Sequence, residues 1–515
     1  MADIQKFTET IQSGYDFKGK SIILGGAMLN GESLPGVLVK APLKTFNRHG
    51  LIAGATGTGK TKSLQMISEQ LSANGVSVLL MDIKGDLSGI AKAGTTNPRI
   101  EERHQKLGVP WSGSNHPVDF LSLSKESGAR LRATVSEFGP VLFSKILDLN
   151  DTQQSVVALI FKYCDDNQLP LLDLKDFKKV MNYVTNEGKE EIESQYGKVS
   201  TATTSTILRK VIELEQQGAE VFFGERSFEV EDLCRCDENG KGMISIVRLT
   251  DIQDKPKLFS TFMLCLLAEI YSSFPEEGDM EQPKLVVFID EAHLIFNEAS
   301  KALLDQIETI IKLIRSKGVG IFFCTQNPAD IPDSVLAQLG MKVQHALRAF
   351  TAKDRKAIKM AAENYPITEF YKVEDMLTAL GMGEAFVSVL NEKGNPTPLA
   401  ATLMQAPRSR MDVLTPQEIE EINAKSFLVK KYNQVVDRES AFEMLTQKIK
   451  ANTAEAPASG KASNTSKQEE QEGSVLQKGA DAVSDFSKST AGRIIIREVT
   501  RGILGILGFG SRRRR

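Results

Sequence analysis

Residues 50–61 read Gly-Leu-Ile-Ala-Gly-Ala-Thr-Gly-Thr-Gly-Lys-Thr, and the order of residue types in this stretch decides the fold. The mostly apolar residues 51–54 predict a strand, and residues 60–74 predict a helix. The loop between them, which we call the phosphate loop, matches the G-x-x-x-x-G-K-[ST] pattern in the required strand–loop–helix context: Gly54-Ala55-Thr56-Gly57-Thr58-Gly59-Lys60-Thr61. The sequence therefore predicts a loop that wraps around a polyphosphate.

The chemistry of the phosphate loop points to a nucleotide and a metal ion. Its glycines let backbone N–H groups approach the phosphates, and the N-terminus of the following helix adds positive potential. We expect Lys60 to reach the β- and γ-phosphates and the Thr61 hydroxyl to bind Mg²⁺. The predicted contacts extend from Gly54 to Lys62, and the predicted ligands are ATP and Mg²⁺.

Nearly continuous apolar strands alternate with helical patterns beyond this loop. Such strands are typical of a parallel sheet that helices cover on both faces. We therefore predict an α/β fold with a mostly parallel sheet. The further strands expected in it are VSVLLMD (76–82), MISIVRL (243–249), KLVVFID (284–290), VGIFFCTQ (319–326), KVQHALRAF (342–350) and EAFVSVL (384–390).

Periodicity and composition divide the chain into parts. The expected parts are a short β-rich segment (1–47), a nucleotide-binding core (48–124 and 226–405), a mostly helical insert (125–225), a helical region (406–450), a flexible low-complexity linker (451–491) and a basic amphipathic tail (492–515). In the tail, Arg493, Arg497 and Arg501 share one helical face. The tail either binds phosphate backbones or an anionic membrane, or packs on a neighbouring subunit or stays solvated.

A second set of polar residues follows the predicted strand 284–290. Asp290 and Glu291 close this strand. In nucleotide hydrolases Asp290 would hold Mg²⁺ and Glu291 would polarise the attacking water as general base. The alternative is simple solvation of a strand end. The phosphate loop favours the functional interpretation, because an adjacent acid suits ATP hydrolysis better than phosphate transfer to small molecules.

Other polar residues are candidates for the same edge of the sheet, where ligands of open α/β sheets bind. Gln326 ends the next strand and is expected to touch the γ-phosphate or the lytic water, unless it caps the following turn. Arg348 and Arg315 are candidates for an arginine that acts on a neighbouring subunit's nucleotide, ahead of Arg355. Arg315 alternatively complements a helix dipole, whereas Arg348 lies in a strand pattern, where a charge needs a partner.

Further charges follow the strand 76–82. Asp82 and Lys84 lie at its carboxyl end. They either support the nucleotide site or a DNA channel, or they form a local ion pair.

Four stretches together resemble the HerA/FtsK class of P-loop motor ATPases, most of all the bacterial HerA-like helicases. The resemblance spans residues 40–405. The stretches are NRHGLIAGATGTGKTKSLQ (47–65), LLMDIKGDLSGIA (79–91), VVFIDEAHLIF (286–296) and FFCTQNPADIPDSVLAQLG (322–340).

This resemblance implies a RecA-like core, a ring that is usually a homo-hexamer, and ATP-driven movement of DNA through it. It implies that Lys60 and Thr61 bind the nucleotide and Mg²⁺ and that Asp290 binds Mg²⁺. It also implies that Glu291 is the catalytic residue and that Gln326 is the sensor of the γ-phosphate or the lytic water. The 47 residues before the core are too few for the β-barrel domain of archaeal HerA, so a nuclease partner is left open. Two other functions remain: a motor that moves protein, like type IV secretion ATPases, and a nucleotide-gated scaffold with little turnover.

Amino-acid composition and net charge exclude some classes of protein. Of 515 residues, 41% are hydrophobic and 25% charged, which excludes disorder of the whole chain, and the net charge of -3 excludes a uniformly basic binder. The five cysteines are an odd, sparse set that fits a reducing cytosol. The sequence has no apolar N-terminal segment and no long apolar run, so we expect a cytoplasmic protein without a transmembrane segment.

Overall fold

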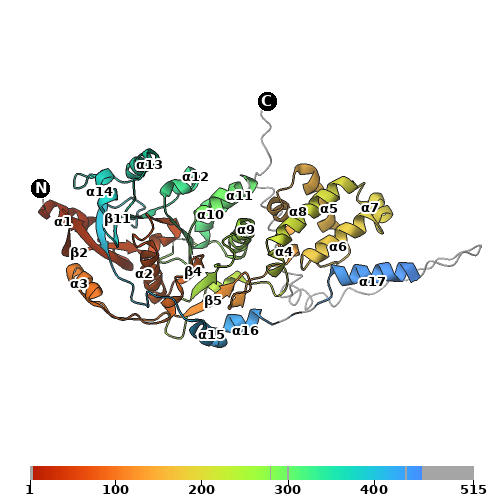
Figure 1. The fold of residues 1–515 in the computed structure, drawn as a ribbon, viewed down its shortest axis with the longest axis horizontal. Coiled ribbons are helices and arrows are strands. Elements are labelled where there is room, and N and C mark those ends of the chain that lie inside the picture. The colour runs from red at the N-terminus through yellow and green to blue at the C-terminus, as the bar shows by residue number, and fades with distance from the viewer. Residues whose placement is uncertain (1–3, 279, 299–300, 435, 437, 455–515) are drawn as a thin grey trace, which may run out of the picture. The chain divides into compact units, whose positions relative to one another are not determined.

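The structure is a computed structural model that describes residues 4–278, 280–298, 301–434, 436 and 438–454 (Figure 1). Within the described residues the chain forms two compact units, residues 4–132 with 226–434 and residues 133–225 with 436 and 438–454. The predicted tail (492–515) and nearly all of the predicted linker (451–491) lie outside the described residues. No helix among the described residues is long and apolar enough to cross a membrane.

A twelve-stranded sheet forms the centre of the first unit, in the order β2–β1–β12–β11–β10–β3–β9–β8–β4–β7–β5–β6. Neighbouring strands are parallel from β10 to β6 and antiparallel from β10 to β2. The predicted α/β fold with a mostly parallel sheet is therefore confirmed. The strands are β1 (Ser21–Leu29), β2 (Glu32–Pro42), β3 (Gly50–Ala53), β4 (Ser77–Asp82), β5 (Val118–Ser122), β6 (Ala129–Arg130), β7 (Ile244–Arg248), β8 (Leu285–Ile289), β9 (Val319–Thr325), β10 (Met341–His345), β11 (Glu384–Ser388) and β12 (Ala400–Met404).

Helices of the first unit pack against this sheet. Strands β3, β4, β8 and β9 are buried at every position, as expected for strands that are covered on both faces. The α-helices of the first unit are α1 (Ile4–Gly14), α2 (Lys60–Ala73), α3 (Pro98–Leu107), α9 (Pro256–Ser273), α10 (His293–Glu298), α11 (Lys301–Ile314), α12 (Asp333–Leu336), α13 (Ala352–Glu363), α14 (Val373–Ala379), α15 (Pro416–Lys425) and α16 (Phe427–Tyr432).

One local prediction was incomplete and another was wrong. Within the segment predicted to be β-rich (1–47), helix α1, which buries Phe7 and Ile11, precedes β1 and β2. The strand expected at 342–350 ends at His345. The carbonyl of the next residue, Ala346, accepts a hydrogen bond from the amide of Ala55 in the phosphate loop, so it does not pair with a neighbouring strand. Arg348 therefore lies exposed in a loop, and its charge needs no buried partner.

Residues 405–414, which we call the strap, run along one face of α2. Side chains three and four positions apart on a helix share a face. Three such side chains bind the strap in order, so the strap runs antiparallel to α2 and reaches its first turn at Met411. Glu69 accepts from the amides of Arg408 (2.7 Å) and Ser409 (3.0 Å), Gln65 donates to the carbonyl of Arg410 (3.0 Å), and Lys62 donates to the carbonyl of Met411 (2.5 Å).

The second unit is helical. Its hydrophobic core contains edge-to-face aromatic contacts such as that between Phe143 and Phe177, with ring centroids 4.8 Å apart. The buried Asp176 carboxylate accepts hydrogen bonds from the Ser440 hydroxyl (2.5 Å) and the amide of Phe442 (2.9 Å), and so fixes the start of α17. The α-helices are α4 (Val135–Ile146), α5 (Asp151–Asp166), α6 (Leu174–Thr185), α7 (Lys189–Gln195), α8 (Thr201–Gln216) and α17 (Ala441–Ala454).

The strap contact generates a stability prediction. Glu69 is only 2% exposed, and Glu69→Ala would leave the part-buried amide of Arg408 and the buried amide of Ser409 without their acceptor. We expect this substitution to lower the free energy of unfolding by about 2–4 kcal/mol in urea titrations. Glu102→Ala is the matched control, because Glu102 is exposed and pairs only with Lys106 one turn away. Equal stability of the two variants would contradict the role given to Glu69.

Candidate active site

The phosphate loop lies between β3 and α2 at the carboxyl edge of the sheet. Its glycines Gly54, Gly57 and Gly59 have φ angles of 152°, 78° and 114°. A Cβ atom on Gly54 would lie 2.5 Å from the Cβ of His345, and one on Gly59 would lie 3.2 Å from the amide nitrogen of Gly383. Backbone conformation and lack of space therefore both require glycine at these two positions.

Two neighbouring strands hold the phosphate loop in place. The amide of Ala55 donates to the carbonyl of Ala346 after β10 (2.8 Å), and the amide of Gly383 before β11 donates to the carbonyl of Thr58 (2.9 Å). In contrast, the amide of Gly57 has no protein acceptor among the described residues, and a Cβ built there would meet no atom within 4 Å. An open amide beside a helix N-terminus is the arrangement that binds a phosphate oxygen.

Lys60 begins α2 and points back into the loop. Its ammonium donates to the carbonyl of Ala55 (3.2 Å), and the residue is 6% exposed. Burial and the positive charge of Lys84 lower the pKa of Lys60, although nearby acids oppose this shift. Thr61 follows in the first turn and is half-buried. The Lys60 ammonium is buried and donates its hydrogen bond to a neutral carbonyl, so it is well suited to bind negatively charged phosphate oxygens.

Lys62 belongs to the predicted nucleotide contacts, but its ammonium is directed to the strap. It donates to the carbonyl of Met411 and to the side chain of Gln65 (3.2 Å). Burial lowers the pKa of Lys62, and the charges of Asp86 and Asp412 oppose this shift. In this arrangement Lys62 links the first turn of α2 to the strap.

The acid pair directly follows β8. Asp290 and Glu291 are 4% and 6% exposed. Burial raises the pKa of Asp290 to about 6, although the charge of Lys84 lowers it. Glu291 has a φ of 46°, a backbone conformation that non-glycine residues adopt at a cost and that is frequent at functional sites. Its carboxylate forms an ion pair with Lys84, and the Nδ1 atom of His293 lies 3.2 Å from its Oε2 atom.

The acid pair and the phosphate loop face the same space. Both Asp290 and Glu291 act on Lys60 and raise its pKa against the effect of burial. The Oδ2 atom of Asp290 is buried and has no hydrogen-bond partner among the described residues. A carboxylate oxygen without a partner, together with the hydroxyl of Thr61, fits Mg²⁺, which takes few protein oxygens and completes its shell with phosphate and water.

Gln326 lies just after β9 and reaches the phosphate loop. Its Oε1 atom accepts a hydrogen bond from the hydroxyl of Thr56 (3.3 Å), and the residue is exposed. The cap of the following turn is made by Asn327, whose side chain accepts from the amide of Ala329 (3.1 Å). Gln326 is therefore not that cap, and its side chain contacts the phosphate loop.

The candidate arginines lie at different edges of the sheet. Arg348 lies after β10 and is two residues from Ala346, which binds the phosphate loop. Arg315 precedes β9 and therefore lies at the opposite edge, where its charge contributes to lowering the pKa of the buried His49. Both are exposed, as is Arg355 on α13. Of Arg348 and Arg315, Arg348 is the one that lies at the edge of its own phosphate loop.

Asp82 has a structural role at the end of β4. Its carboxylate accepts from the amides of Gly85 (2.8 Å), Asp86 (3.1 Å) and Leu87 (3.2 Å). Burial and the charge of Asp86 raise its pKa to about 7. Asp82 thus shapes the loop that carries Lys84, and the ion pair of Lys84 is with Glu291 rather than with Asp82.

His345 is a site residue that sequence reasoning missed. It is the last residue of β10 and fully buried below Gly54. Its Nδ1 atom donates to the carbonyl of Glu384 (2.9 Å), so its Nε2 atom accepts from the hydroxyl of Ser63 (2.9 Å). Burial lowers the pKa of His345 to about 4. A histidine in a strand pattern gives no sign of such partners, because both are distant in sequence.

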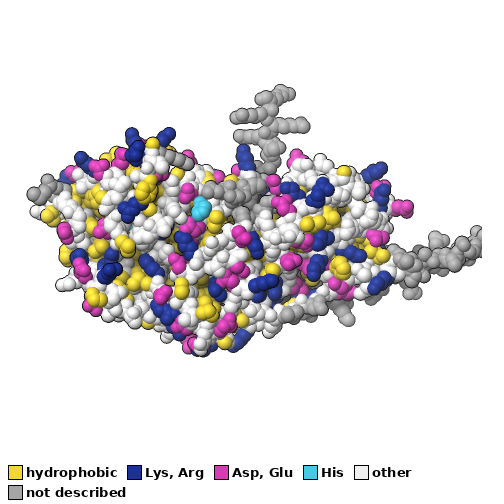
Figure 2. All heavy atoms as spheres, viewed as in Figure 1, with side chains coloured by type: hydrophobic (Ala, Val, Ile, Leu, Met, Phe, Trp, Pro, Cys, Tyr) yellow, Lys and Arg dark blue, Asp and Glu magenta, His cyan; other side chains and the backbone are white. Residues whose placement is uncertain are grey.

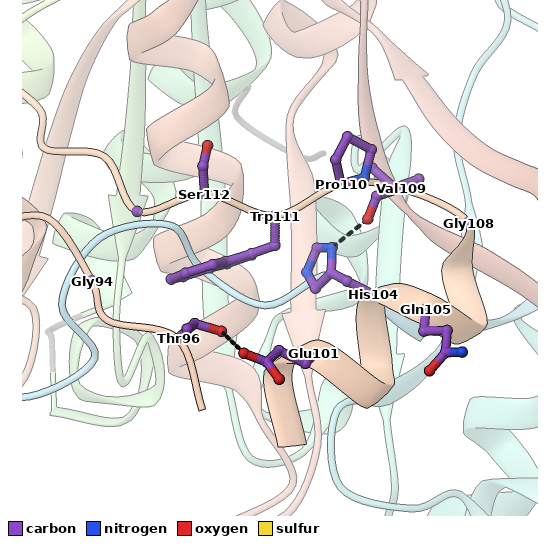
Figure 3. A pocket seen from close by; sticks show the side chains of 11 residues that line it. Gly94, Thr96, Glu101, His104, Gln105, Gly108, Val109, Pro110, Trp111 and Ser112 are labelled. Carbon is purple, nitrogen blue, oxygen red and sulfur yellow. Dashed lines mark hydrogen bonds between the residues drawn. The ribbon is translucent and has the colours of Figure 1, made fainter. Parts of the chain in front are cut away.

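A separate pocket of about 740 Å³ lies beside α3 (Figure 3). Figure 3 shows the indole of Trp111 above Thr96 and Glu101, whose side chains are hydrogen-bonded (3.1 Å). The indole N–H donates to the carbonyl of Pro407 in the strap (3.0 Å), and the Nε2 atom of His104 accepts from the amide of Ala406 (3.3 Å). The indole N–H of Trp111 and the Nε2 atom of His104 thus bind the strap, while the Nδ1 atom of His104 donates to the carbonyl of Val109 (3.0 Å).

Charge is mixed on the molecular surface. On the face drawn in Figure 2, lysine and arginine side chains alternate with acidic ones, and the described residues of that face show no continuous basic stripe. The described residues also contain no group of three or more His, Cys, Asp and Glu side chains that could hold a metal.

Comparison with known proteins points to one family. A family model described as "Helicase HerA-like C-terminal" matches residues 28–514, which confirms the resemblance indicated by the four motifs. A protein of Sulfolobus acidocaldarius named DNA double-strand break repair helicase HerA is 22% identical over 360 residues, 68% of this chain and 64% of that relative. Its namesake from Saccharolobus solfataricus is 23% identical over 404 residues, 75% of this chain and 71% of the relative. The chain thus spans about two thirds of these relatives' length.

The fold is also found among solved structures. The bacterial conjugative coupling protein TrwBdeltaN70 superimposes with a TM-score of 0.50 and 15% identity, covering 79% of this chain and 95% of that one. This likeness concerns the fold.

The buried histidine generates a pH prediction. The pKa of His345 is about 4 in the folded protein, whereas that of an ordinary histidine is 6.5, so the unfolded state binds the proton first as pH falls. Stability from this group is complete above pH 6.5 and is lost between pH 6.5 and 4. From neutral pH to about pH 4.5, we expect urea titrations to show the wild type losing about 2 kcal/mol more unfolding free energy than His345→Gln. Equal losses would show that His345 is not held neutral.

Proposed function

The chain belongs to the HerA-like helicase C-terminal family, and from this premise we propose that it is an ATP- and Mg²⁺-dependent ring motor that acts on DNA. The observation that carries this proposal is the position of the acid pair. Two buried carboxylates that act on the phosphate-loop lysine are suited to hydrolysis rather than to binding alone.

Binding of the triphosphate follows from the shape of the loop. Open amides such as that of Gly57 and the ammonium of Lys60 take the phosphate oxygens. Thr61 and Asp290 are the residues that would hold Mg²⁺, which when bound neutralises charge on the β- and γ-phosphates. Because β10 and β11 fix the loop through hydrogen bonds, the donors are oriented before the nucleotide arrives.

Hydrolysis is assigned to Glu291. Its carboxylate takes a proton from water as the water oxygen bonds to the γ-phosphorus and the bond to the bridging oxygen breaks, which releases ADP. Gln326, already beside Thr56, orients the water or the γ-phosphate. The fixed, strained backbone at Glu291 holds the base in one direction.

A ring explains how an arginine completes the site. In a head-to-tail ring, the nucleotide of one subunit faces a different surface of its neighbour. Arg315 lies at the sheet edge opposite to its own phosphate loop and thus suits action across subunits, whereas Arg348 lies beside its own site. A homo-hexamer is the expected assembly.

DNA is proposed as the cargo because the similar archaeal proteins are named as helicases of DNA repair. The two archaeal proteins are named as DNA repair helicases, and no basic surface of this chain carries the argument independently. Stimulation of turnover by DNA would separate this function from a protein-moving motor, and negligible turnover would favour a nucleotide-gated scaffold.

Two substitutions test the hydrolytic site. We expect Lys60→Ala to abolish measurable ATP hydrolysis because the triphosphate loses its buried ammonium, a loss of about 100-fold or more. We expect Glu291→Gln to lower turnover by about 100-fold or more while ATP still binds, because only the base is removed. Steady-state phosphate release, with and without duplex DNA, and equilibrium ATP binding measure both effects.

Lys18→Ala is the control, because Lys18 is an exposed lysine outside the site. It should match the wild type. Undiminished hydrolysis by both Lys60→Ala and Glu291→Gln would reject the assigned site.

Mixing experiments test the arginine. Subunits with Lys60→Ala and subunits with Arg315→Ala are each expected to be nearly inactive. In an equal, random mixture, about one quarter of the sites combine an intact phosphate loop with an intact neighbouring arginine, and activity recovers to that share. No recovery would rule out Arg315 as the residue acting across subunits, and the same mixture with Arg348→Ala tests the other candidate.

A further inference from the structure

Lys84 lies in the loop after β4, which is held rigidly at its base. The carboxylate of Asp82 binds three successive amides of this loop, and Gly85 has a φ of 76°. The side chain of Lys84 is 38% exposed, so its ammonium retains access to solvent. The backbone of this loop is thus fixed while the lysine side chain can change direction.

The ammonium of Lys84 is shared by the acid pair. It forms an ion pair with Oε1 of Glu291 and lies 4.0 Å from Oδ2 of Asp290. Within the described part of the chain, no other lysine or arginine comes within 4.0 Å of these carboxylates, since Lys60 donates to a loop carbonyl instead. His293, near the other oxygen of Glu291, is the remaining basic group in contact.

Two adjacent buried carboxylates need such a counter-ion. Like charges taken out of water raise each other's energy, and removing the partner of a buried charge is strongly destabilising. The same ammonium conflicts with catalysis, because a carboxylate oxygen engaged by a cation is a poor acceptor for the proton of water. The contact therefore suits the nucleotide-free protein better than the hydrolysing one.

We propose that Lys84 is the resting counter-ion of the Asp290–Glu291 pair and that it passes from Glu291 to the phosphates of a bound nucleotide, which frees Glu291 to act as base. This inference rests on the proposed ATPase function. Lys84 follows β4 and the phosphate loop with Lys60 follows β3, and because these strands are parallel in one sheet, both lysines lie at its carboxyl edge, where a triphosphate would lie. Lys84 is thus a positioning residue that prevents Glu291 from acting before the nucleotide is bound.

The first test needs no activity. We expect Lys84→Met to lower the melting temperature of the nucleotide-free protein by about 3 °C or more, because the acid pair loses its counter-ion. Adding Glu291→Gln should restore most of this loss, because it removes one unpaired charge, and Lys84→Arg should keep the wild-type value. Lys18→Met is the matched control. Additive effects of Lys84→Met and Glu291→Gln would overturn the counter-ion role.

The second test follows the nucleotide. We expect Lys84→Met to weaken ATP binding and to lower single-turnover hydrolysis by about 10-fold each, whereas Lys84→Arg keeps most of both. A variant that binds and hydrolyses ATP like the wild type, despite a changed melting temperature, would reject transfer to the phosphates. A loss of DNA stimulation alone would reject it in favour of a DNA-contacting lysine. If the wild type hydrolyses no ATP, the proposed function fails, while the melting-temperature cycle still tests the ion pair.

Discussion

The structure depends on one electrostatic constraint, which is the burial of two adjacent carboxylates at the end of a central strand. Asp290 and Glu291 are almost inaccessible to solvent, and a protein interior does not tolerate such charges without partners. Lys84 forms the ion pair, and Lys60 adds further positive charge. Three oxygens of the pair, Oδ2 of Asp290 and both carboxylate oxygens of Glu291, have no hydrogen-bond partner among the described residues, and we assign Oδ2 of Asp290 to Mg²⁺. A site that needs cations to be stable is also a site that binds a metal-bound polyphosphate.

The sheet brings these groups together because β3, β8 and β4 are close in its order and parallel. Their carboxyl ends carry the phosphate loop, the acid pair and the loop of Lys84, so sequence segments more than 200 residues apart meet at one edge. The strap adds a second layer of order. It follows one face of α2 to the first turn, so the position of the phosphate-loop helix is tied to residues after the last strand. Because hydrogen bonds join the strap to α2, a movement of one would shift the other.

Local sequence patterns predict much of the arrangement of the site. The strand–glycine loop–helix order predicts the phosphate loop, and apolar strands that end in Asp290, Gln326 and Asp82 predict which side chains gather at one edge. Contacts between distant segments could not be read in this way. His345 looks like an ordinary strand residue, the length of β10 is decided by a hydrogen bond from Ala55, and helix α1 depends on burying Phe7 and Ile11 against the sheet unit. These features depend on tertiary partners and not on periodicity.

The most direct test of the central claim is a density map of the protein with Mg²⁺ and a slowly hydrolysed ATP analogue. We predict triphosphate density along residues 54–61, with the metal between Thr61 and Asp290 and the γ-phosphate facing Glu291. Nucleotide density elsewhere, for example beside Trp111, with the phosphate loop and acid pair unchanged, would contradict the account.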